Sequence, residues 1–98
     1  NATQRQKLCI ARAIIKKPDV LILNQATSGF DLSTQTRLMK NILKEFEGRS
    51  LIWSLDHAEK TAEFDYVLIM RGGRIADQGR PDKLKEGSDL YKEMLSAS

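Results

Sequence analysis

A run of apolar residues at positions 20–23, Val-Leu-Ile-Leu, constrains the fold of this 98-residue chain more than any other feature. Pro18 precedes the run, and the polar residues Asn24 and Gln25 follow it. A continuous apolar run that is short and bounded by breakers is typical of a strand buried on both faces of a parallel sheet. Because parallel strands need crossover connections, usually helical, the run points to an α/β fold.

The segments around this run alternate between helical and strand patterns. In residues 3–17, Leu8, Ala11 and Ile15 recur at helical spacing, which predicts that they form the buried face of a helix. Pro18 ends that helix. A second helix is predicted over 34–46, capped by Asp31 or Ser33, and a second strand over 50–54. A short helix over 57–64 and a strand over 66–70 follow. The pattern then predicts a hairpin turn at 71–74, a returning strand over 74–77 and short helices over 82–97. This order predicts a parallel sheet flanked by helices, with a closing antiparallel hairpin.

Composition limits the classes of protein that the chain can represent. Charged residues make up 30% and hydrophobic residues 41%, a mixture typical of a soluble folded chain. Neither 20–23 nor 67–70 is long enough to cross a bilayer. The net charge of +3 comes from basic residues interleaved with acidic ones, so a solvated helix face explains it better than a phosphate-binding patch. The single cysteine, Cys9, indicates a reducing compartment and is expected to be buried.

Four segments carry recognisable motifs. They read Q-R-Q leading into I-A-R-A at 4–13, L-I-L-N-Q-A-T-S at 21–28, S-G-F-D at 28–31, and D-Y-V-L-I-M continuing to G-R-I-A-D-Q-G at 65–79. In this order and register they resemble the end of the signature motif, the Walker B strand, the D-loop and the closing hairpin of an ATP-binding cassette (ABC) ATPase domain. The resemblance covers nearly the whole chain and implies a partial P-loop NTPase fold, corresponding to the C-terminal half of that domain.

The resemblance assigns roles to individual residues. Asn24 takes the position of the aspartate that supports Mg²⁺, and Gln25 takes the position of the glutamate that polarises the attacking water. Gln4 is the remnant of the signature motif, and Asp31 is the D-loop aspartate. The implied ligands are ATP and Mg²⁺ in the full-length protein, with none expected for this fragment.

The same residues depart from the family pattern. An amide is a neutral ligand and cannot accept a proton as a carboxylate does, so Asn24 and Gln25 predict a degenerate site, whether natural or engineered. The spacing back from Asp65 places Asp56 at the family's switch position, where a histidine is usual, and His57 comes one residue later. Either residue is a candidate for the switch.

The phosphate-cradling motif G-x-x-x-x-G-K-[ST] does not occur in the chain. We therefore expect residues 3–98 to be the C-terminal half of the domain, whose other half lies upstream, and residues 1–2 to be a tag remnant. The expected partners are that N-terminal half, a second ABC ATPase domain and transmembrane transporter segments, with no nucleic acid. The expected location is the cytoplasmic face of a membrane.

The resulting hypothesis is an ABC-type fragment that couples ATP binding or hydrolysis to membrane transport in the full protein and is inactive alone. In the family's sheet another strand lies between those at 50–54 and 66–70, so the isolated chain is expected to form homo-oligomers. The alternative is a small stand-alone α/β interaction module without nucleotide chemistry. A basic nucleic-acid-binding domain is a weaker alternative, because the chain has no recognised motif or aromatic platform for it.

Overall fold

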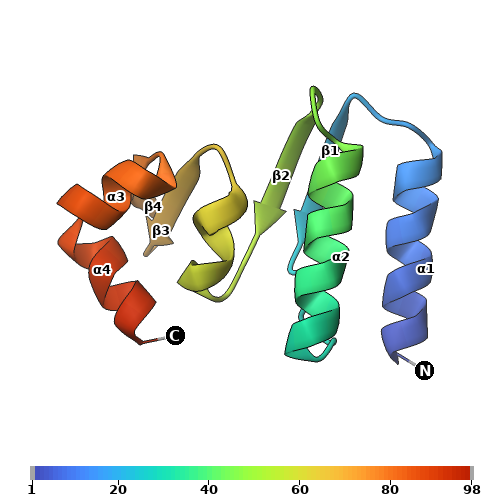
Figure 1. Ribbon diagram of the computed structural model, residues 1–98, viewed down its shortest axis with the longest axis horizontal. Helices are drawn as coiled ribbons and strands as arrows, with labels where there is room; N and C mark the ends of the chain where they lie inside the picture. The colour runs from blue at the N-terminus through green and yellow to red at the C-terminus, as the bar shows by residue number, and fades with distance from the viewer. Residues whose placement is uncertain (1, 98) are drawn as a thin grey trace. The chain divides into compact units, whose positions relative to one another are not determined.

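The computed structural model describes residues 2–97, with side chains from residue 4 onward. The elements are α1 (Ala2–Ile15), β1 (Val20–Asn24), α2 (Leu32–Glu45), β2 (Ser50–Ser54), the 3-10 helix η1 (Ala58–Glu63), β3 (Val67–Arg71), β4 (Arg74–Gly79), α3 (Pro81–Gly87) and α4 (Asp89–Ser96) (Figure 1). The chain divides after Asp56 into two compact units. The described strands form two separate two-stranded sheets, one in each unit, which confirms the predicted α/β architecture.

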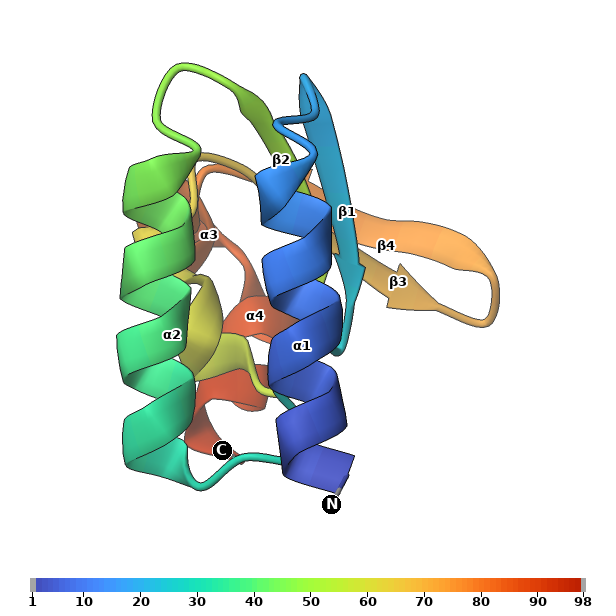
Figure 2. The ribbon, with the colours of Figure 1, turned by 90° about the vertical axis from the view of Figure 1, so that its right-hand side faces the viewer.

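In the first unit, β1 and β2 run parallel with Leu21 opposite Leu51 and Leu23 opposite Trp53. Helices α1 and α2 lie side by side (Figures 1 and 2) and pack on the face of the sheet that carries Leu21 and Leu23. The core that joins these layers consists of Ile10, Leu21, Leu23, Phe30, Ile42 and Phe46. The predicted parallel pairing of these strands is therefore confirmed.

Strand β1 is buried on one face only, so the expectation of a strand buried on both faces is wrong for this structure. Its exposure alternates along the strand, and Ile22 is 69% exposed. Because both helices of this unit pack on the face of Leu21 and Leu23, the side chains of Val20 and Ile22 remain exposed on the other face, beside Ile52 of β2.

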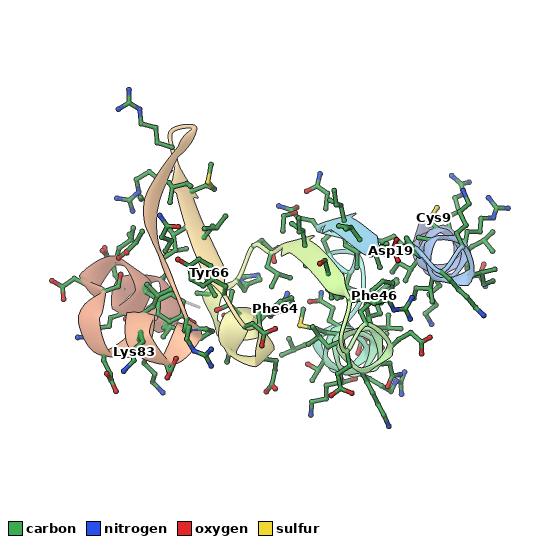
Figure 3. The ribbon with its side chains drawn as sticks, turned by 90° about the horizontal axis from the view of Figure 1, so that it is seen from above. Cys9, Asp19, Phe46, Phe64, Tyr66 and Lys83 are labelled. Atoms are coloured by element: carbon green, nitrogen blue, oxygen red, sulfur yellow. The ribbon has the colours of Figure 1, made fainter. Side chains whose placement is uncertain are left out.

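Helix α1 also buries a different face from the predicted one. Ile10, Ala13 and Ile14 pack against the core, whereas Leu8, Ala11 and Ile15 are exposed. Cys9 is exposed as well, contrary to the expected buried thiol (Figure 3). The helix includes Ala2, ends at Ile15 and is followed by a left-handed residue at Lys17 (φ +50°). Asn1 lies outside the described residues.

Helix α2 begins two residues earlier than predicted, at Leu32, with Asp31 rather than Ser33 at the N-cap position. Gln35, Met39 and Ile42 are its buried residues. Gly48 follows the helix with φ +80°, in the left-handed region that glycine adopts without steric penalty. The predicted helix is thus confirmed, with an earlier start.

The second unit is built on the predicted hairpin. Strands β3 and β4 pair antiparallel with an irregularity between Ile69 and Met70, and β4 extends to Gly79, two residues further than expected. Gly72 and Gly73 both have positive φ, as a tight hairpin turn requires. The core of this unit consists of Ala58, Val67, Ile69, Leu84 and Tyr91. Among the described helices, none is long and apolar enough to cross a membrane.

Candidate functional site

Polar groups meet where the two parallel strands end. Asn24 and Ser54 are register partners at the carboxyl ends of β1 and β2. The Ser54 hydroxyl donates a hydrogen bond to Asn24 Oδ1 at 2.6 Å and accepts one from the backbone N–H of Gln25 at 3.0 Å. The Gln25 N–H also lies 3.1 Å from the Ser54 carbonyl oxygen. We refer to Asn24, Gln25 and Ser54 as the edge cluster.

Gln25 has a strained backbone. Its φ of +48° lies in the left-handed region, where an L-residue other than glycine costs roughly 1–2 kcal/mol. The conformation turns the chain out of β1, and the Ser28 N–H then donates to the Gln25 carbonyl at 3.1 Å. Strained residues of this kind concentrate at functional sites, where the surrounding structure holds them in place. Here Ser54 supplies that hold on the Gln25 amide.

Gln6 of α1 fixes the loop that follows the edge cluster. Its Nε2 donates to the Ala26 carbonyl oxygen at 2.8 Å. Its Oε1 occupies the space beside Gly29, so that a Cβ on residue 29 would approach this oxygen to 2.5 Å. An alanine at position 29 would therefore require the Gln6 side chain to move. Gln4, the predicted signature remnant, is exposed in the first turns of the same helix.

Asp31 lies beyond this loop at the start of α2. Hydrogen bonds from the side chains of Thr34 and then Ser33 lower the pKa of its carboxyl group. The Ser33 hydroxyl is 2.9 Å from Asp31 Oδ2. Asp31 is exposed, so it presents an ionised carboxylate at the surface near neutral pH.

The two switch candidates lie just after β2. Asp56 is exposed and lies two residues after Ser54, past the carboxyl end of β2, where the first unit ends. His57 is exposed at the N-cap position of η1 and opens the second unit. Which of the two takes the switch role stays a prediction.

The edge cluster offers neutral oxygens to a metal. Among the described residues there is no group of three or more His, Cys, Asp or Glu side chains that could hold a metal ion. Mg²⁺ prefers oxygen ligands, retains several waters and is commonly held by one or two carboxylates together with substrate phosphates. The Asn24 amide and Ser54 hydroxyl therefore fit indirect support of an Mg²⁺ bound to phosphate, and they do not fit a dedicated protein cage.

Sequence reasoning identified Asn24 and Gln25 but not the residues that hold them. Ser54, at the end of the second strand, is the residue that holds both of them. Gln6 was not singled out. A local signal for it is weak, because Gln6 and Ala26 are 20 residues apart in sequence.

The chain is similar to known proteins over nearly all of its length, although no protein-family profile matches it. It is 33% identical to the ABC transporter gloK of Glarea lozoyensis over 97% of the chain and 7% of that protein. It is 34% identical to ABC transporter C family member 9 of Arabidopsis thaliana, over 94% of the chain and 6% of the relative. It is also 34% identical to the leukotoxin translocation ATP-binding protein LktB of Mannheimia haemolytica, over 90% of the chain and 13% of the relative.

The fold matches a solved structure as well. A bacterial Atm1-family ABC exporter with ATP bound superimposes with a TM-score of 0.88 and 30% sequence identity, covering 96% of this chain and 17% of the exporter chain. The chain thus spans only a small part of the length of each protein that it matches.

Proposed function

Since this chain is homologous to a segment of ABC transporter proteins and shares the fold of the matching segment of an ABC exporter, we propose that it forms part of an ATP-binding domain of this type. ATP would lie at the carboxyl edge of β1 and β2, where open α/β sheets bind their ligands. The observation that carries the proposal is the edge cluster, in which Ser54 holds Asn24 and Gln25 together at that edge. We assign Asn24 and Gln25 to the positions of the family's Mg²⁺-supporting and water-polarising groups.

The two amides make this site a weak hydrolytic centre. Gln25 can orient a water through its side-chain oxygen, but it cannot take the proton that the water must lose. Asn24 adds no negative charge, and its Oδ1 already accepts the Ser54 hydroxyl hydrogen bond. We therefore propose a degenerate site that binds ATP in the complete domain and hydrolyses it slowly.

The remaining site residues complete the proposal. Asp31 acts as the D-loop carboxylate, Gln4 belongs to the signature region, and Asp56 or His57 takes the switch position. An aspartate at the switch would repel a γ-phosphate, whereas a histidine can donate a hydrogen bond to it. Asp56 would therefore weaken the site further.

The phosphate-binding backbone must come from outside these 98 residues, because they contain no G-x-x-x-x-G-K-[ST] segment. Its source in the proposal is the N-terminal half of the same domain. A second ABC ATPase domain and transmembrane segments complete the assembly, which would place the chain at the cytoplasmic face of a membrane. A degenerate copy suits the weaker half of an asymmetric pair.

A chimera tests the nucleotide-binding part of the proposal. Residues 4–97 would replace the matching segment of the bacterial Atm1-family exporter, and binding of a fluorescent ATP analogue would be measured with Mg²⁺ present. Saturable binding supports an ATP site. A chimera that folds, as judged by its thermal unfolding, but does not bind the analogue would favour a stand-alone interaction module. The 98-residue chain alone should show no saturable heat with Mg-ATP and no turnover.

A further inference from the structure

The hydrogen bonds of the Ser54 hydroxyl determine which atom of the Asn24 amide lies beside it. The backbone N–H of Gln25 donates to Ser54 Oγ at 3.0 Å, which leaves the hydroxyl hydrogen of Ser54 to donate elsewhere. Ser54 Oγ lies 2.6 Å from Asn24 Oδ1, a separation that is short for an N–H···O bond and ordinary for an O–H···O bond. The amide oxygen of Asn24 is therefore the atom beside Ser54, and the NH₂ group takes the other branch of the amide.

This orientation of Asn24 is set inside the first unit. Asn24 and Ser54 are register partners at the carboxyl ends of the parallel pair β1 and β2. The Gln25 N–H lies 3.0 Å from Ser54 Oγ and 3.1 Å from the Ser54 carbonyl oxygen, which ties the two strand ends together. Because all of these groups belong to one compact unit, the orientation does not depend on what covers this edge in the complete domain.

An amide held in this way meets a ligand mainly as a hydrogen-bond donor. Asn24 carries no charge, its Nδ2 donates, and its Oδ1 has one lone pair left beside the bond from Ser54. Indirect support of Mg²⁺ by Asn24 is confined to that lone pair. A carboxylate at this position would attract the cation and repel phosphate, whereas an NH₂ group attracts phosphate oxygens directly.

We infer that Ser54 is a positioning residue that lowers the dependence of nucleotide binding on Mg²⁺, because it holds Asn24 with its NH₂ group available to the phosphates. The inference rests on the proposed ATP site. It specifies the chemical form that this site accepts, which is a nucleoside triphosphate with or without its bound cation.

The opposite orientation of Asn24 would give the opposite preference. With Nδ2 beside Ser54, the amide oxygen would face the ligand, repel phosphate oxygens and favour the Mg²⁺ complex. Removal of the Ser54 hydroxyl frees the amide to turn over when Mg²⁺ is present, so it should increase the dependence on the cation. The Gln25 N–H keeps its backbone acceptor, the carbonyl oxygen of residue 54, in such a variant.

Binding of a fluorescent, non-hydrolysable ATP analogue to the chimera of residues 4–97 with the Atm1-family exporter tests the inference. The dissociation constant is measured with EDTA and with excess Mg²⁺, and the ratio of the two constants is the readout. Loss of a group that supports a metal through its bound water weakens metal binding by about 10–100-fold. Asn24→Asp should therefore raise the ratio at least about tenfold above that of the chimera.

Two substitutions at Ser54 isolate the role of its hydroxyl. Threonine and valine have similar shapes and both suit a strand, but only threonine keeps the hydroxyl. Ser54→Thr should keep the ratio of the chimera, whereas Ser54→Val should raise it several-fold, toward that of Asn24→Asp. The same two substitutions at Ser50, which lies opposite Val20 at the other end of β2, should give equal ratios. Thermal unfolding would check that each variant is folded.

The outcomes distinguish this inference from the site on which it rests. A folded chimera that binds the analogue neither with Mg²⁺ nor with EDTA would overturn the ATP site and the inference together. Binding that depends on Mg²⁺ as strongly in the chimera as in its Asn24→Asp variant would overturn the inference and leave the ATP site standing. Equal ratios for Ser54→Thr and Ser54→Val would also overturn it, because the hydroxyl would then not orient Asn24.

Discussion

Replacing Gln25 by glycine should stabilise the first unit relative to replacing it by alanine. Alanine keeps the Cβ that makes the φ of +48° unfavourable, by roughly 1–2 kcal/mol for an L-residue. Glycine removes this strain but gains roughly 0.5–1 kcal/mol of chain entropy in the unfolded state. The difference predicts that Gln25→Gly has a free energy of unfolding about 0.5–1 kcal/mol higher than Gln25→Ala.

Urea and thermal unfolding followed by the fluorescence of Trp53 would measure this difference. Trp53 is the single tryptophan of the chain and lies in β2 beside Ser54, so its emission reports on the unit that contains Gln25. At roughly 4–8 °C per kcal/mol for a chain of this size, the difference in Tm should be about 2–8 °C.

A position without positive φ supplies the control. Ser28 lies in the same loop and is outside the positive-φ residues, so Ser28→Gly should be less stable than Ser28→Ala. If Gln25→Gly proved equal to or less stable than Gln25→Ala, the left-handed conformation would not store the strain assigned to it. The edge cluster would then not be holding Gln25 in an unfavourable conformation.

Three further predictions concern other parts of the chain. The lowered pKa of Asp31 means that its ionised carboxylate stabilises the fold fully above the ordinary pKa of 3.8, and that this stabilisation is lost as the pH falls through the lower pKa of the folded state. In Asp31→Asn the free energy of unfolding should therefore fall less steeply with decreasing pH at the acid end. Tyr91→Phe removes a hydroxyl that lies 2.6 Å from Thr61 Oγ1, so hydrogen exchange should show the second unit destabilised by about 1 kcal/mol. The control Tyr66→Phe removes an exposed hydroxyl 3.4 Å from Gln78 Oε1 and should have little effect. Unpaired strand edges should make the isolated chain a dimer or larger oligomer by light scattering, and a well-folded monomer at high concentration would contradict this.

The elements of the fold were predictable because their signals are local. The apolar run at 20–23, the breaker Pro18 and the glycine pair Gly72 and Gly73 each act on the backbone near them, and the structure has a strand, a helix end and a hairpin turn at those places. Which faces become buried was not predictable in the same way. Helix α1 has two sets of apolar residues at helical spacing, and only the packing of α1 against the sheet decides between them.

The candidate site shows the same limit. The motif indicated Asn24 and Gln25, but their partner Ser54 is 30 and 29 residues away along the chain. Register between β1 and β2 brings them together, and no local pattern encodes that register. The contact of Gln6 with Ala26 likewise depends on how α1 packs against the sheet.

Hydrolysis by the chimera of residues 4–97 with the Atm1-family exporter tests the central claim most directly. A general base contributes on the order of a hundredfold or more to rate, so with ATP bound the chimera should turn over at least about a hundredfold more slowly than the exporter. Asn24→Asp together with Gln25→Glu should restore most of that loss, aided by Asp56→His if Asp56 holds the switch position. Hydrolysis by the unmodified chimera at the exporter's own rate would contradict the account, because the amide pair would then not limit the chemistry.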